Sequence, residues 1–411
     1  MIDVVRLTGF LEERLPEALE LLRAMVSINS FTGNRAGVDR LGRFTAATFG
    51  VLGMTAEFVA STHPGWGDHL VMTRPGRSGR SLALVSHLDT VFPPEEEERN
   101  AFRWQREGDR IYGPGTQDIK GGTVMMWLVL SALQALAPAT FEAITWRLFW
   151  NSSEEQFSPD FGGVCRSRFD AGTLAALVFE AEGRLEETPQ LVVARKGRAA
   201  WRISVQGRGA HAGSHPRQGA NAIVQLAHLL PRIAALTDYG RDLTFNVGSV
   251  QGGTVLNRVP HEAVAEGEFR CFTAEVFAEA QAALLALEGH GEVASVTDGF
   301  ACQNRVEILS ESLPWPRNPG SDRLFAVWQR AARELGRSVK AQARGGLSDG
   351  NLLWDVVPTL DGLGPWGEHD HCSERSADGA KVPEYVAASS FVPKAVWNVR
   401  AIERLLDEGN R

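Results

Sequence analysis

The sequence predicts an α/β protein with a mostly parallel sheet, helices on both faces, and an inserted ferredoxin-like α+β domain. Apolar runs alternate with helical patterns in the first half of the chain, and shorter alternating segments follow from residue 194. With 411 residues, the chain is longer than a single hydrophobic core usually supports. We therefore expect a larger domain formed by 1–193 and 306–411, and an inserted domain at 194–305.

The elements of the larger domain follow from the spacing of its apolar residues. Leucines at helical intervals predict a helix at 8–26, and a turn after it leads into a second predicted helix at about 39–52. Apolar runs that end in polar or acidic residues predict strands at 81–91, 143–155 and 175–183. A further helix is expected to begin near Lys120. Because strands alternate with helices, the pattern predicts a mostly parallel sheet whose carboxyl ends meet at one edge.

The inserted domain is predicted from alternating apolar and polar residues, which are typical of strands with one exposed face. The predicted strands are 199–213, 243–253, 262–272 and 292–300, and the predicted helices are 221–236 and 274–287. This order of elements, β-α-β-β-α-β, is the split pattern of ferredoxin-like domains.

The composition argues against several classes of protein. Apolar residues make up 44% of the chain, and the net charge of -8 gives no sign of a nucleic-acid-binding surface. The four cysteines are far apart, which fits neither a disulfide framework nor a thiolate zinc site. No apolar stretch reaches the roughly 18 residues of a membrane span, and the N-terminus lacks a signal-peptide pattern. We expect a soluble cytoplasmic protein without nucleic-acid or membrane partners.

Polar side chains gather where the predicted strands end and in nearby loops. They are His87, Asp89, Asp118, Glu154, Glu155, Glu180, Glu182, His369 and His371. Imidazole and carboxylate groups without thiolates suit Zn²⁺ or a similar divalent ion. So many acids at one edge would repel one another strongly without a cation among them. The sequence therefore predicts a divalent metal site at this edge of the sheet.

A series of motifs carries a family resemblance. In chain order, the motifs are SHLDTV, GPGTQDIKGG, NSSEEQ, RGAHAG, GGTVLNRVP, GLSDGN and GLGPWGEHDHCS. From about residue 20 to its C-terminus, the chain resembles the aminoacylase, acetylornithine deacetylase and glutamate carboxypeptidase family of two-zinc hydrolases. The resemblance implies a zinc-peptidase-like catalytic domain and a homodimer formed through the inserted domain. It also implies two Zn²⁺ ions per subunit, with Co²⁺ or Mn²⁺ as substitutes.

The resemblance further implies which residues bind the metals. The matching positions are His87 and Glu180 for one ion, Glu155 and His371 for the other, and Asp118 as the carboxylate that bridges both. Two of these positions have a rival nearby in the sequence. Glu182 could take the place of Glu180, and His369 could take the place of His371.

The same motifs imply roles in catalysis. Glu154 resembles the general base that accepts a proton from the attacking water and passes it to the leaving amine. Asp89 lies two residues after His87 on the same strand face, so it could hold the second N–H of that imidazole. His211 resembles a histidine that crosses the dimer interface to stabilise the oxyanion of the reaction.

Two further positions resemble contacts to the substrate. Asn257 matches a residue that contacts substrate near the carbonyl under attack. Arg344 lies where carboxypeptidase members bind a free carboxylate, for which a guanidinium fork is well suited. The tail that follows His371 is longer than in the simplest carboxypeptidases, and this difference bears on the substrate rather than on the metal site.

These features predict an enzyme that hydrolyses an amide or peptide bond next to a free carboxylate. The resemblance is closest to the glutamate carboxypeptidase branch, with a small peptide as the substrate. One alternative is an N-acyl-amino-acid deacylase of the acetylornithine deacetylase or aminoacylase kind. A second alternative is a non-catalytic dimeric binding protein built on the same fold.

Overall fold

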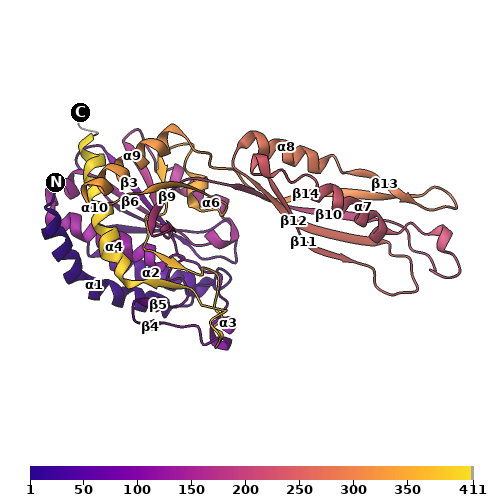
Figure 1. The fold of residues 1–411 in the computed structure, drawn as a ribbon, viewed down its shortest axis with the longest axis horizontal. Helices are drawn as coiled ribbons and strands as arrows, with labels where there is room; N and C mark the ends of the chain where they lie inside the picture. The colour runs from indigo at the N-terminus through magenta and orange to yellow at the C-terminus, as the bar shows by residue number, and fades with distance from the viewer. Residues whose placement is uncertain (409–411) are drawn as a thin grey trace. The chain divides into compact units, whose positions relative to one another are not determined.

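The computed structural model describes residues 1–408 and divides into two compact units (Figure 1). The larger unit comprises 1–193, 317–343 and the residues from 348 onwards. The smaller unit comprises 194–316 and 344–347. The sequence places the second domain boundary at residue 305, whereas the smaller unit continues to Pro316. None of the helices within residues 1–408 is long and apolar enough to cross a membrane.

The larger unit is built on a six-stranded sheet with the order β1-β2-β6-β3-β7-β16. Its strands are β1 (Thr55–Val59), β2 (His69–Arg74), β3 (Ser81–His87), β6 (Thr145–Asn151), β7 (Thr173–Val178) and β16 (Thr359–Leu360). The pairs β6–β3, β3–β7 and β7–β16 are parallel, and β1 and β2 form an antiparallel edge. The predicted mixed α/β layer with a largely parallel sheet is confirmed.

Alternate residues of the central strands enter two different hydrophobic clusters, one on each face of the sheet. Leu82 and Leu84 of β3 pack with α1, α4 and α10, whereas Ala83 and Val85 pack with α6. This alternation is the period of two that a strand imposes on its side chains. Because both faces are apolar, helices cover both of them, which is why the strands read as continuous apolar runs.

The helices and minor strands of the larger unit have the following bounds. The helices are α1 (Val4–Val26), α2 (Arg35–Gly50), α3 (Pro94–Arg99), α4 (Lys120–Leu136), α5 (Pro138–Ala143), α6 (Pro159–Arg166), α9 (Pro319–Glu334) and α10 (Phe391–Glu408). The short strands are β4 (Gln105–Glu107), β5 (Arg110–Tyr112), β8 (Gly183–Leu185), β17 (Gly367–Glu368) and β18 (Tyr385–Ala387). Two longer strands, β9 (Thr188–Arg195) and β15 (Lys340–Arg344), begin in the larger unit, and their last residues, 194–195 and 344, belong to the smaller unit.

The smaller unit is a five-stranded antiparallel sheet with the order β11-β12-β10-β14-β13. Its elements are β10 (Gly197–Gln206), α7 (Ala222–Ala234), β11 (Thr244–Gly252), β12 (Glu262–Cys271), α8 (Ala274–Leu285), β13 (Gly289–Ala294) and β14 (Ala301–Ser312). Trp201, Ile203 and Val205 of β10 point into a core shared with both helices. The other face of β10 is only partly buried.

One strand of the smaller unit differs from the sequence prediction. Residues 292–300 were expected to complete the split pattern, but the strand that pairs with β10 is β14, and β13 lies at the sheet edge. The physical reason is the longer alternation in β14, which buries Cys302, Asn304 and Val306. This strand also carries the smaller unit past the predicted boundary at 305.

Candidate metal centre

Three parallel strands deliver the predicted site residues to one edge of the sheet. His87 is the last residue of β3, and it lies opposite Asn151, the last residue of β6. Glu154 begins a short 3-10 helix directly after β6, and Glu180 follows β7 by two residues. The carboxyl ends of parallel strands are where α/β sheets place their ligand sites. The parallel arrangement of β3, β6 and β7 therefore brings His87, Glu154 and Glu180 to the same edge of the sheet.

Asp118 reaches the same edge from the loop that precedes α4. Gly122, in the first turn of α4, lies against the backbone of Phe179, and a Cβ there would collide with the Phe179 carbonyl oxygen. Glycine removes this clash, so the start of α4 can approach the end of β7 closely. The approach places Asp118 near Glu180.

Three side chains form the first group of donor atoms. The His87 Nε2 atom lies 2.9 Å from Asp118 Oδ1 and 3.8 Å from Glu180 Oε1. One ligand atom from each of these residues lies within 4.8 Å of the others. His87 is fully buried, and Asp118 and Glu180 retain little exposure. One imidazole and two carboxylates at this spacing suit a divalent cation.

A second group lies beside the first and shares Asp118 with it. His371 Nε2 lies 3.3 Å from Glu155 Oε2 and 3.5 Å from Asp118 Oδ2. The other carboxylate oxygen of Glu155 is buried and has no hydrogen-bond partner among the described residues. A buried oxygen without a donor fits a site where a cation binds. The two oxygens of Asp118 thus face different groups, as a carboxylate shared by two ions would.

The two rival residues lie outside these groups. Glu182 forms a buried ion pair with Lys394 at 2.9 Å and accepts a hydrogen bond from Arg184 at 3.0 Å, so its charge is already compensated. The His369 ring packs beside the ring of Tyr385, with 6.0 Å between their centroids. The structure therefore brings Glu180 and His371, rather than their rivals, to the two groups.

The electrostatics of the centre are those of carboxylates crowded together. Burial raises the pKa of Glu155 to about 7, and the negative charge of Asp118 adds to this shift. Hydrogen bonds to Asp118 and Glu155 raise the pKa of His371 to about 11. Burial alone would raise the pKa of Asp118, but hydrogen bonds from His371 and His87 hold it below its usual range. These carboxylates need positive charge beside them, as the ligands of a cation do.

Glu154 lies next to both groups without belonging to either. Desolvation raises its pKa well above the usual value, and the charges of Glu155, Glu180 and Asp349 add to the effect. A carboxyl group with a raised pKa that does not bind metal can accept and release a proton near neutral pH.

The turn that carries Glu154 and Glu155 is fixed by Asp89. The Asp89 carboxylate accepts hydrogen bonds from the Glu154 and Glu155 amides, at 3.0 and 3.2 Å, and from the Thr32 hydroxyl at 2.6 Å. The His87 Nδ1–H donates to the Asp89 backbone carbonyl at 3.0 Å. The Oδ1 atom of the Asp89 carboxylate is farther from His87 Nδ1, at 3.4 Å. The backbone of Asp89 thus orients the imidazole, and its side chain serves mainly the Glu-Glu turn.

A buried network that sequence reasoning missed supports the same turn. Asn151 Nδ2 donates to Asp349 at 2.7 Å, and Asn151 Oδ1 accepts from the Ser153 amide and the Ser158 hydroxyl. Burial raises the pKa of Asp349 to about 7. Asp349 belongs to the GLSDGN motif, which was the only signal in the sequence, and the motif did not indicate its partner.

His211, Asn257 and Arg344 belong to the smaller unit. The Ala212 amide donates to the Asn257 carbonyl at 2.9 Å, so the loops that carry His211 and Asn257 are adjacent. His211 Nδ1 accepts from the amides of Gly213 and Ser214, which leaves its Nε2 to carry the proton of the neutral ring. The Arg344 carbonyl accepts a hydrogen bond from the Lys196 amide, which lies directly before β10. His211 lies beyond the other end of β10, so Arg344 and His211 are at opposite ends of this strand.

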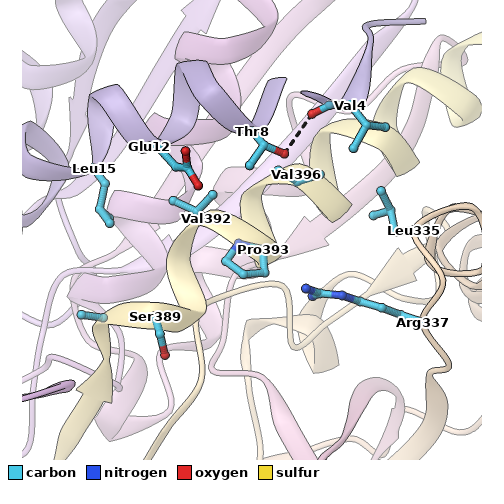
Figure 2. Close-up of a pocket in the computed structure, with 11 residues that line it drawn as sticks. Val4, Thr8, Glu12, Leu15, Leu335, Arg337, Ser389, Val392, Pro393 and Val396 are labelled. Atoms are coloured by element: carbon cyan, nitrogen blue, oxygen red, sulfur yellow. Dashed lines mark hydrogen bonds between the residues drawn. The ribbon is translucent and has the colours of Figure 1, made fainter. Parts of the chain in front are cut away.

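A cavity of about 460 Å³ lies away from these residues, between α1 and α10 (Figure 2). Its lining includes the apolar side chains of Leu15, Val392 and Val396 and the charged side chains of Glu12 and Arg337. None of the predicted site residues lines it. The cavity is therefore separate from the metal centre.

Several known proteins are similar to this chain. Residues 193–289 match a family model described as a peptidase dimerisation domain. Carboxypeptidase G2 of Pseudomonas sp. (strain RS-16) is 31% identical over 381 residues, which cover 91% of this chain and 88% of the relative. The chain belongs to the M20 peptidase family.

Two further proteins match over nearly the whole chain. The succinyl-diaminopimelate desuccinylase of Paracidovorax citrulli is 26% identical, over 95% of this chain and 98% of the relative. A tripeptidase from Staphylococcus aureus has the same fold, with a TM-score of 0.73 and 22% identity over 99% of this chain and 100% of that one. Membership makes the chain a hydrolytic enzyme rather than a non-catalytic binding protein.

The contacts of Asp89 generate a testable prediction. In Asp89→Asn, an amide NH₂ replaces an oxygen that accepts hydrogen bonds, so the Glu-Glu turn loses part of its support. We expect hydrolytic activity to fall about 10–100-fold in a folded protein. Steady-state kinetics with circular dichroism would measure this. The control Asp355→Asn removes an exposed ion pair with Arg166 and should behave as wild type; a fully active Asp89→Asn enzyme would contradict the assignment.

Proposed function

We propose that this protein is a two-metal hydrolase that removes a C-terminal residue by cleaving the amide or peptide bond next to a free carboxylate. The observation that carries the proposal is the Asp118 carboxylate, which is shared by two groups of ligand atoms beside the non-ligating Glu154. The 31% identity to a carboxypeptidase over most of both chains supports this choice of reaction.

The proposed metal ligands are those of the two groups. His87, Asp118 and Glu180 would hold one Zn²⁺, and Asp118, Glu155 and His371 would hold the other. Co²⁺ or Mn²⁺ could substitute, because the donors are nitrogen and oxygen atoms. A pair of such ions supplies a water whose pKa is lowered to roughly 7.

The chain's own residues then move the protons and place the substrate. Glu154 accepts a proton from the attacking water and delivers it to the leaving nitrogen. His211 donates its Nε2–H to the carbonyl oxygen as negative charge develops there, and Asn257 contacts the substrate near the same atom. Arg344 binds the free carboxylate of the substrate with its guanidinium group.

His211 is proposed to act in the site of a second copy of the chain. The match of residues 193–289 to a peptidase dimerisation domain supports a homodimer formed through the smaller unit. In such a dimer, each subunit supplies the oxyanion donor for its partner, as the family resemblance implies.

A second candidate is an N-acyl-amino-acid deacylase. It is favoured by the desuccinylase relative, which matches nearly the whole length of both chains. The proposed metals, base and oxyanion donor would be the same for both reactions. The two candidates differ in the groups that flank the scissile bond.

Replacing Glu154 with Gln tests the proposed base. Gln cannot accept the proton of the water, so we expect kcat to fall by about 10²–10⁴-fold. Metal content should be unchanged, because Glu154 belongs to neither group of ligands. Metal analysis and steady-state kinetics measure the two quantities. Wild-type protein stripped by a chelator serves as the matched inactive state, and unaltered turnover by Glu154→Gln would remove this residue from the mechanism.

A substrate panel distinguishes the two candidate reactions. Peptides and N-acyl compounds with a C-terminal glutamate should be hydrolysed faster than N-acetylated amino acids with other side chains, measured as kcat/KM. Arg344→Gln should raise KM for the C-terminal glutamate compounds, because it removes a charged hydrogen bond to their carboxylate. Turnover of the N-acetyl amino acids alone would reject the carboxypeptidase and favour the deacylase.

Mixing two inactive variants tests whether His211 acts across the dimer. His211→Ala supplies an intact metal centre, and Glu154→Gln supplies an intact His211. Random exchange of subunits should make half of the dimers mixed, each with one restored site, and so recover about a quarter of wild-type activity. Activity that stays at the level of the separate variants would contradict an exchange of His211 between subunits.

A further inference from the structure

Glu384 is a buried acid that the proposed mechanism does not use. It lies in the long tail after His371, directly before β18, and its side chain has no solvent exposure. Burying a carboxyl group costs free energy unless hydrogen bonds within the protein replace those that it formed with water. The partners of Glu384 therefore indicate what its burial accomplishes.

The side chain of Glu384 binds the backbone of the loop that carries the shared carboxylate. Its Oε1 atom accepts hydrogen bonds from the Gln117 amide at 2.8 Å and from the Asp118 amide at 3.3 Å. Its Oε2 atom has no hydrogen-bond partner among the described residues. A single oxygen thus holds two successive amides in place.

Strand pairing explains why Glu384 reaches this loop. β18 is antiparallel to β5, with Tyr385 opposite Tyr112. The residues that follow Tyr112 therefore run beside those that precede Tyr385, and Asp118 lies a few residues further along. The register of this small sheet places Glu384 beside the loop.

The backbone of Glu384 makes a second connection, to the loop that carries the other ligand. The Glu384 amide donates to the Cys372 carbonyl at 2.8 Å, and Cys372 directly follows His371. Glu384 thus contacts two of the three segments that supply the second ligand group, with its side chain on the Asp118 loop and its backbone on the His371 loop.

We propose that Glu384 is a positioning residue that joins the Asp118 and His371 loops and so sets the spacing of the second metal site. This inference rests on the proposed two-metal function. Glu384 belongs to neither group of ligand atoms; it acts through the backbone of Asp118. Because residues that orient metal ligands contribute strongly to binding, its loss should be measurable in metal affinity itself.

The test compares three substitutions in the full-length protein by titration with Zn²⁺ after metal removal. Glu384→Ala removes the accepting oxygen, and Glu384→Asp shortens its reach by one CH₂ group. Both should weaken Zn²⁺ binding by about 10–100-fold. Glu384→Gln keeps a carbonyl oxygen at the Oε1 position and should bind Zn²⁺ as wild type does. Absorption spectra of the Co²⁺-loaded proteins should change in the Ala and Asp variants only.

The control and the readout separate positioning from ordinary stability. Glu374→Gln alters an exposed acid of the same tail that pairs with Lys381, and it should leave Zn²⁺ binding unchanged. A purely structural role would lower the unfolding temperature of Glu384→Ala but leave Zn²⁺ affinity intact well below that temperature. If Glu384→Ala does not fold, Glu384→Asp, which retains the carboxyl group, decides the question.

The outcomes also separate this inference from the proposed function. Wild-type Zn²⁺ affinity in folded Glu384→Ala or Glu384→Asp would overturn the positioning role, and so would a loss in Glu384→Gln as large as in the Ala variant. If the wild-type protein binds two ions but hydrolyses none of the substrates in the panel, the proposed function fails while the role of Glu384 stands.

Discussion

The position of the Asp118 carboxylate between the imidazoles of His87 and His371 is the constraint on which the candidate metal centre depends. Each of its oxygens faces a different group, so both groups are misplaced if this side chain moves. The parallel order of β3, β6 and β7 brings the other acids to it, and Gly122 lets α4 begin close enough. Such a concentration of negative charge is stable only with positive charge inside it.

Three buried carboxyl groups accept hydrogen bonds from the segments that carry or support the ligand residues. Asp89 accepts from the Glu-Glu turn, Asp349 accepts from Asn151, and Glu384 accepts from the Asp118 loop. In each case a carboxyl group binds an amide rather than another charge. An amide donor satisfies a buried oxygen without cancelling the negative charge that attracts a cation, so these residues fix the geometry and leave the field of the centre intact.

Sequence patterns predicted the parts of the structure that depend on local order. Apolar runs ending in His87, Glu154 and Glu180 located the sheet edge, because strand ends and topology determine where those residues go. The contacts of Asp89 with Thr32 and of Glu384 with Asp118 join segments with no common motif, so no local pattern could indicate them. β14 does carry a local alternation, but its place beside β10 is set by pairing across the sheet, which the sequence does not show.

The long tail after His371 now has a different interpretation from the one its length suggested. A hydrogen bond from the Glu384 amide to the Cys372 carbonyl holds the two ends of the segment 373–383 together. The exposed residues 377–380 show that the middle of this segment lies at the surface. Doubling the length of a flexible loop costs only about 0.6 kcal/mol once its ends are fixed. A change in the length of this segment therefore need not disturb the metal ligands, provided that Glu384 remains at its end.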